Sequence, residues 1–318
     1  RLGRDFTLES LKTDGCEAVF LAVGAPENLA LGVAGEEAEG VVQAVPFLRE
    51  YNIRGSVPVG KRVLVIGGGN AAVDAARTAI RLDAEEVTII YRRTQEQMPA
   101  YDEEIDEALH EGVTLRTLIQ PVEIVSDESG KAAGVRCLSM TLGEFDRSGR
   151  RRPTASQEEP ELIPADQVII AIGQRLEPKS ILGKTEIETR PDRFIDADPK
   201  TGKTSKEWVF AGGDMVTGPS SVVTAIGAGE KAAVGMDEFL SGENHAFWRG
   251  EWENDTAYDP DADPVPYPRE KLPTVDVERR RANFDEVELC WTEAAAMRQC
   301  DRCLRCDYGK SRKEAAHA

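Results

Sequence analysis

The chain has 318 residues, of which 41% are hydrophobic, and a formal net charge of −18; this length accommodates about two globular domains. The acidic balance argues against binding nucleic acid or an anionic membrane surface, because phosphate recognition needs clustered Lys and Arg. No apolar stretch approaches the roughly 20 residues that span a bilayer. The first residues show neither an apolar signal core nor transit-peptide character, so we expect a cytoplasmic protein without a membrane span.

The first clear element is AVFLAVGAP at residues 18–26, which predicts a short buried strand ending at Gly24. A glycine-containing loop and an amphipathic helix around residues 42–49 are expected next. The continuous apolar run RVLVIGGG at residues 62–69, the Ala-rich residues 70–82 and the second run EVTIIYRR at residues 86–93 then form a strand–helix–strand unit. Strands that are apolar throughout indicate a parallel sheet covered on both faces.

The turn after the first of these strands carries a dinucleotide-binding signature. Gly67, Gly69 and Ala72 match the pattern G-x-G-x-x-A between a predicted strand and a predicted helix, with Asn70 and Ala71 opening that helix. Gly67 permits a tight turn, Gly69 lets backbone approach a pyrophosphate, and Ala72 allows close helix–strand packing. The alternative is a structural glycine turn without a ligand.

The end of the second strand bears on the choice of nucleotide. NAD sites usually place an acidic residue there to hold the ribose 2′-hydroxyl, whereas this chain has Arg92 and Arg93. Arginine binds a 2′-phosphate through charge-assisted hydrogen bonds, which favours NADPH. The alternative is two solvated arginines at a strand end.

Later segments continue the pattern. A helix is expected at residues 101–111 and a strand at residues 114–118, followed by short strands and polar turns over residues 122–162, typical of a hairpin excursion. VIIAIG at residues 168–173 returns to the sheet and ends at Gly173. WVFAGGD at residues 208–214 predicts another strand, and residues 222–239 a helix. A Pro- and Asp-rich linker around residues 255–269 precedes a helical tail.

Several of these segments resemble the glutamate synthase small-subunit family of flavin- and pyridine-nucleotide-dependent oxidoreductases. The resemblance rests on VLVIGGGNAAVDAARTAIRLDAEEVTIIYRRTQEQMPA, on LGVAGEEAEGVVQAVPFL and on VFAGGDMVTGPSSVVTAIGAGEKAA. It implies an α/β fold with two Rossmann-like domains, in which an NADPH domain is inserted into a discontinuous FAD-type domain, followed by a helical Cys-containing tail. The corresponding divisions are residues 1–54 and 173–245 for the FAD-type domain, 55–172 for the NADPH domain, 246–270 for the linker and 271–318 for the tail.

The resemblance also implies a flavin site. Gly213 and Asp214 would bring a carboxylate to a flavin ribityl hydroxyl, and the helix beginning near Val222 and Val223 would aim its amides at the flavin pyrimidine carbonyl. Reduced flavin gathers negative charge there. Gly173 is counted among the cofactor-binding glycines. The alternative for Asp214 is a turn cap.

This family begins with its own strand–GxGxxG–helix unit for the ADP half of FAD, and the chain contains no second such motif. The first residues of the chain, RLGRDFTLES, resemble the interior of a longer sequence. Either the sequence is a fragment, or another polypeptide supplies the ADP-binding motif.

Four cysteines crowd the C-terminal end: Cys290, Cys300, Cys303 and Cys306. A C-x2-C-x2-C run suits a [4Fe–4S] cluster, because neighbouring ligands must wrap one small cube. Zinc bound by four thiolates and a tail of unligated thiols are the alternatives. Only the ending RCLRC matches the family resemblance, so Cys290 and Cys300 are ligand candidates from their spacing alone.

Together these features predict an NADPH-dependent flavin oxidoreductase subunit that passes electrons from NADPH through FAD to iron–sulfur centres or an electron-acceptor partner. One alternative is a non-catalytic scaffold or assembly subunit with an incomplete flavin site. Another is a flavin oxidase or monooxygenase.

Overall fold

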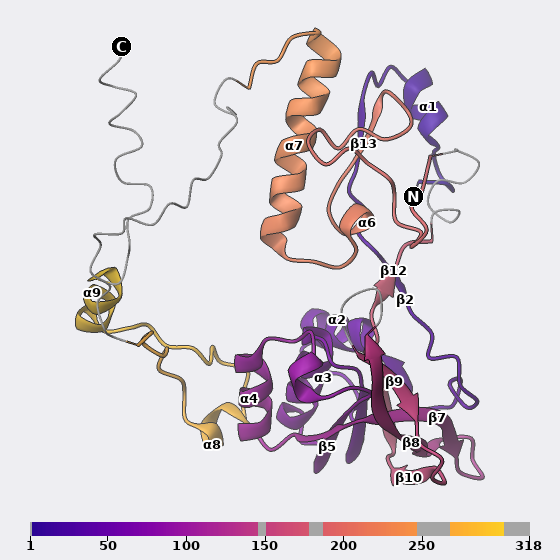
Figure 1. Cartoon of the computed structure of the whole chain (residues 1–318), viewed down its shortest axis with the longest axis vertical. Helices are drawn as coiled ribbons and strands as arrows, with labels where there is room; N and C mark the ends of the chain where they lie inside the picture. The colour runs from indigo at the N-terminus through magenta and orange to yellow at the C-terminus, as the bar shows by residue number, and fades with distance from the viewer. Residues whose placement is uncertain (1, 146–150, 178–186, 247–267, 302–318) are drawn as a thin grey trace. The chain divides into compact units, whose positions relative to one another are not determined.

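A computed structural model describes residues 2–145, 151–177, 187–246 and 268–301 (Figure 1). The chain divides into two compact units, Arg1–Phe247 and Trp248–Ala318.

A five-stranded parallel sheet forms the centre of the nucleotide-binding part of the first unit. Its strand order is β3 (Val41–Gln43), β11 (Gln167–Ile170), β4 (Arg62–Ile66), β5 (Glu86–Tyr91) and β6 (Thr114–Thr117). Side chains alternate across a strand, and β4 shows this directly: Val63 and Val65 belong to one buried cluster, Leu64 and Ile66 to another. The sheet is therefore covered on both faces, which confirms the prediction from its continuous apolar runs.

One face of this sheet packs against helices α2 (Ala44–Arg54), α3 (Asn70–Arg81) and α4 (Asp102–His110), through residues such as Phe47, Ala72 and Ile105. The other face packs against an antiparallel sheet formed by β7 (Ile119–Ser126), β8 (Ala132–Phe145), β10 (Glu161–Pro164) and β9 (Arg151–Ala155), in which β8 pairs with each of the other three strands. This sheet is the hairpin excursion that the sequence predicted.

The chain on either side of these sheets forms a second, smaller α/β layer. β1 (Val19–Leu21) and β13 (Val209–Ala211) pair in parallel, and their core includes Leu8 of α1 (Leu8–Thr13) and Met215 of α6 (Asp214–Thr217). The long helix α7 (Val222–Ser241) follows (Figure 1). Antiparallel β2 (Glu27–Asn28) and β12 (Gln174–Arg175) mark the two passages of the chain between the layers. The predicted α/β class is confirmed.

The structure corrects the bounds of the helix expected at residues 42–49. Residues 41–43, at the edge of the predicted helix 42–49, are strand β3, because their backbone pairs with β11; the helix begins at Ala44 and continues to Arg54. Both β3 and α2, which lie within residues 1–54 of the predicted domain division, pack with the five-stranded sheet.

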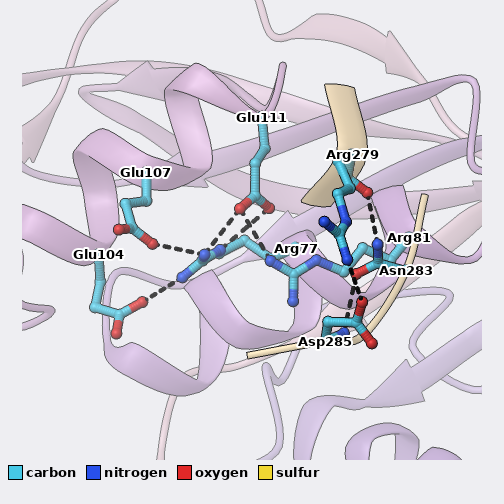
Figure 2. A network of polar contacts seen from close by, with 8 residues as sticks. All are labelled: Arg77, Arg81, Glu104, Glu107, Glu111, Arg279, Asn283 and Asp285. Carbon is cyan, nitrogen blue, oxygen red and sulfur yellow. Dashed lines mark hydrogen bonds and ion pairs between the residues drawn. The ribbon is translucent and has the colours of Figure 1, made fainter. Parts of the chain in front are cut away.

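The described part of the second unit, residues 268–301, contains two short helices, α8 (Val277–Arg280) and α9 (Glu293–Asp301). The prediction of a helical tail is wrong between them. There the chain turns back: the Asn283 side chain donates to the Arg279 carbonyl at 2.9 Å and accepts from the Asp285 amide (Figure 2). Thr274 then bridges Glu288 in antiparallel fashion.

Among the described residues, no helix combines the length and apolar character needed to cross a membrane.

Candidate dinucleotide-binding site

The turn between β4 and α3 is shaped by steric necessity at two glycines. Gly67 has φ +151°, and a Cβ there would lie 2.3 Å from the Ala171 carbonyl oxygen. A Cβ on Gly68 would lie 2.6 Å from the Tyr91 ring. Sequence reasoning assigned a role to Gly67 and missed Gly68, because the clash that excludes a side chain comes from the neighbouring strand β5.

Gly69 is different, and this difference points to a ligand. Its φ of −94° is open to any residue, and the nearest atom to an added Cβ is Pro99 Cγ at 3.9 Å, an ordinary contact. The protein itself therefore does not require glycine at this position. A bound group approaching the backbone would.

The start of α3 presents backbone donors beside Gly69. The Ala72 and Val73 amides donate to the Gly69 carbonyl, whereas the amides of Asn70 and Ala71 meet no acceptor within the described part of the chain. Ala72 is completely buried against the sheet. Two open amides at the positive end of a 12-residue helix form an anion-binding position.

A short segment after β5 lies against this turn. The Ala100 amide donates to the Gly68 carbonyl at 3.1 Å, and the Tyr101 amide donates to the Asn70 side-chain oxygen at 3.1 Å. The Tyr91 hydroxyl donates to the Gln97 carbonyl, within the 3-10 helix η1 (Gln95–Gln97). Asn70, predicted as a cofactor contact, thus fixes the segment that borders the site.

The two arginines at the end of β5 differ in environment. Arg92 is exposed, and its side chain makes no ion pair with the described residues. Arg93 is only 5% exposed, and its Nε donates to the Arg151 carbonyl of β9 at 3.0 Å. The structure therefore places Arg92 at the surface, while Arg93 links the two sheets.

Helix α4 is fixed to α3 by a buried ion cluster that sequence analysis did not single out. The Arg77 guanidinium lies between Glu104, Glu107 and Glu111 at 2.6, 2.7 and 2.8 Å (Figure 2). Arg81 adds a contact of 2.9 Å to Glu111, whose side chain has no exposed surface. Burial by itself lowers the pKa of Arg77, but the hydrogen bond that Arg77 donates to Glu111 and the three carboxylate charges raise it overall. Because α4 follows the segment that contacts Gly68 and Asn70, this Arg77 cluster also positions the border of the site.

A second concave region lies at the carboxyl ends of β1 and β13. It has a volume of about 240 Å³ and is lined by Phe20, Ala22, Gly24, Gly212, Gly213, Asp214, Ser220, Ser221, Val222 and Ala225. Gly213 has φ +68°, and a Cβ on Gly212 would lie 3.0 Å from the Phe20 ring. The volume is below the roughly 300–1,000 Å³ of typical sites for drug-sized ligands.

Two predicted flavin contacts converge on this region. Asp214 Oδ1 accepts a hydrogen bond from the Ser220 amide at 3.1 Å, so the predicted alternative of a turn cap describes one of its two oxygens. The Ser221 side chain caps α7 at Thr224, and the amides of Val222 and Val223 find no acceptor within the described ranges. Gly173 lies elsewhere, after β11, where its carbonyl accepts from the Leu29 amide and supports the β2–β12 pair.

The structure describes two of the four cysteines predicted as metal ligands. Cys290 and Cys300 are exposed and free of disulfides, whereas Cys303 and Cys306 lie outside the described residues. Within residues 2–145, 151–177, 187–246 and 268–301, no group of three or more His, Cys, Asp or Glu side chains is arranged to hold a metal ion. Cys137 is buried, and burial above all raises the pKa of its thiol to about 12, consistent with an inert core residue.

A glycine turn between a parallel strand and a helix, with open amides and a strand-end arginine, defines a dinucleotide-binding α/β protein. Residues 3–229 match the family model described as pyridine nucleotide-disulphide oxidoreductase, and the chain belongs to that family.

Similar proteins support this family assignment. The chain is 39% identical over 317 residues to the beta subunit of an NADP(+)-dependent formate dehydrogenase from Moorella thermoacetica, covering 96% of this chain and 44% of the relative. It is 38% identical over 253 residues to the glutamate synthase [NADPH] small chain of Escherichia coli, covering 75% of this chain and 53% of the relative. The chain thus spans about half the length of these relatives.

The fold also resembles FprA of Mycobacterium tuberculosis in complex with NADPH, with a TM-score of 0.63 at 22% identity, covering 76% of this chain and 67% of that chain. At this identity the similarity concerns the fold alone.

Proposed function

We propose that this chain is the NADPH-binding and flavin-contacting part of an oxidoreductase that passes electrons from NADPH to a partner. The observation that carries the proposal is the turn at residues 67–72. Its first two glycines are required by the protein's own packing, whereas a Cβ at Gly69 would meet no described atom closer than 3.9 Å.

We infer from the geometry which groups receive each part of the nucleotide. The open amides of Asn70 and Ala71 receive the pyrophosphate, because they add hydrogen-bond donors to the positive end of α3. Arg92, exposed at the end of β5, receives the 2′-phosphate. A relative's name includes NADP(+) and another's includes NADPH, which agrees with this choice over NADH.

The second concave region fits the flavin half of FAD. The free oxygen of Asp214 is an acceptor for a ribityl hydroxyl, and the amides of Val222 and Val223 are donors for the pyrimidine carbonyl. When bound, the flavin supplies the conversion of a two-electron hydride into single electrons. The residues themselves orient the ring system and favour negative charge at the start of α7.

The exposed face of α7 supports completion of this site by an ADP-binding segment or a separate polypeptide. Val222, Val223 and Ile226 are 76, 78 and 66% exposed, although the helix is predominantly apolar. In the two-stranded sheet β1–β13, the outer edge of β13 bonds to residues 202–204, whereas β1 pairs with no strand on its other edge within the described residues. Such small sheets need further partners for stability. We infer that the missing motif covers this face.

We also propose that Cys290, Cys300, Cys303 and Cys306 would hold an iron–sulfur cluster, which would supply one-electron transfer toward the acceptor. The two described members, Cys290 and Cys300, are exposed and unpaired, as ligands to a cluster would be before it is bound. The names of two relatives contain the word subunit or chain, which supports a partner in this role.

The test uses the full chain in two stages. Calorimetry with NADPH, NADH and 2′,5′-ADP measures nucleotide binding, and absorbance after addition of FAD, with and without a polypeptide carrying the ADP-binding motif, measures flavin retention and its bleaching by NADPH. Binding of neither NADPH nor NADH would overturn the proposal. Nucleotide binding without flavin retention in any combination would favour the scaffold alternative, and rapid NADPH consumption with oxygen as sole acceptor would favour the oxidase.

A further inference from the structure

Strand β9 brings additional positive charge to the end of β5. The Arg93 Nε–Arg151 carbonyl hydrogen bond of 3.0 Å fixes β9 beside the residue that follows Arg92. The backbone is also joined nearby, since the Leu118 amide donates to the Arg93 carbonyl and the Met140 amide of β8 donates to the Leu118 carbonyl. Because β9 pairs with β8, both the Arg93–Arg151 hydrogen bond and these backbone hydrogen bonds fix β9 relative to the end of β5.

Three exposed arginines follow the end of β5 or lie at the start of β9. Arg92, Arg151 and Arg152 are all exposed, and none forms an ion pair with the described residues, although the whole chain carries a net charge of −18. Arg151 is instead held over the Phe145 ring, with its guanidinium carbon 5.8 Å from the ring centroid. Exposed arginines without a carboxylate partner are available to bind an anion through charge-assisted hydrogen bonds.

Arg93 is buried, so it is less accessible to an anion than the sequence alone implied. It is 5% exposed, and its Nε already donates a hydrogen bond to β9. Its guanidinium therefore connects the parallel and antiparallel sheets. The exposed charge at this place comes from one arginine of β5 and two of β9.

We propose that Arg151 and Arg152 complete, with Arg92, the site for the 2′-phosphate of NADPH, and that these β9 residues determine the preference for NADPH over NADH. This inference rests on the proposed nucleotide function. Arg93 is a positioning residue in this arrangement: it holds β9 at the strand end without contacting the phosphate.

The test compares wild-type protein with an Arg151→Ala/Arg152→Ala variant, measuring dissociation constants for 2′,5′-ADP, NADPH and NADH by calorimetry. Charge-assisted hydrogen bonds of this kind correspond to about a 10- to 100-fold loss in affinity. We expect that loss for 2′,5′-ADP and NADPH, with NADH binding unchanged. Arg92→Ala should show the same selectivity. Arg136→Ala, which removes an exposed arginine elsewhere on β8, is the matched control and should change none of the constants.

The outcomes distinguish a failure of the β9 assignment from a failure of the proposed NADPH-binding function. If wild-type protein prefers NADPH and the double variant keeps that preference, the assignment of β9 is wrong while the proposed function stands. If NADH affinity falls as much as NADPH affinity, β9 acts on the fold of the site and the assignment is also wrong. If wild-type protein binds neither nucleotide, the proposed function fails first.

Discussion

Replacing Arg77 by Met removes a cation that lies within 2.8 Å of the Glu107 and Glu111 carboxylates. The Arg77 side chain is 11% exposed and that of Glu111 is 0% exposed, so water cannot restore the lost interaction. Breaking a buried ion pair by removing one partner costs about 3–5 kcal/mol in the free energy of unfolding. By contrast, Glu104 is 42% exposed, and its replacement by Gln should cost about 0–1 kcal/mol.

Urea unfolding of the full chain, followed by far-UV circular dichroism, measures both variants against wild type. A loss of 3–5 kcal/mol corresponds to a midpoint decrease of roughly 6–20 °C in a matching thermal scan. NADPH affinity should fall as well for Arg77→Met, because α4 anchors the segment that contacts Gly68 and Asn70. An Arg77→Met variant within about 1 kcal/mol of wild type, or no more affected than Glu104→Gln, would refute the argument from burial.

Three further predictions concern the nucleotide turn, α7 and the antiparallel sheet. Gly69→Ala should leave stability unchanged but abolish NADPH binding measured by calorimetry, whereas Gly68→Ala should lower the unfolding midpoint because its Cβ would lie 2.6 Å from the Tyr91 ring; equal midpoints for the two variants would contradict this. Ile226→Glu, on the exposed face of α7, should reduce FAD retention in the completed assembly without altering 2′,5′-ADP binding, and unchanged retention would rule that face out. The hydrogen bond from Arg116 lowers the pKa of Glu161 below its ordinary 4.5, so this pair stabilises the fold above pH 4.5 and the contribution is lost as pH falls through the lower folded-state value. Acid titration of Glu161→Gln should therefore show a smaller loss of stability below pH 4.5, by under about 1 kcal/mol because the site is exposed; an identical acid profile would contradict the pairing.

Much of the fold could be predicted from local patterns. The run RVLVIGGG and the Ala-rich residues after it specify strand β4, the turn and α3, because hydrophobic periodicity and glycine placement act over only a few residues. The same locality explains the error at residues 41–43: their strand character depends on pairing with β11, more than a hundred residues later in the chain. The tail between α8 and α9 was misjudged for the same reason, since its turn depends on side-chain contacts of Asn283.

The amino-acid sequence by itself determined the nucleotide turn, the α/β class and the presence of two arginines at a strand end, because each is encoded in contiguous residues. Only the tertiary structure decided which of those arginines is exposed, which glycines the packing requires and which carboxylates surround Arg77. These properties depend on atoms from distant strands and helices: the Tyr91 ring excludes a side chain at Gly68, and the Arg151 carbonyl engages Arg93. Burial and hydrogen bonding between elements are set by the packing of the whole chain, and no local pattern contains them.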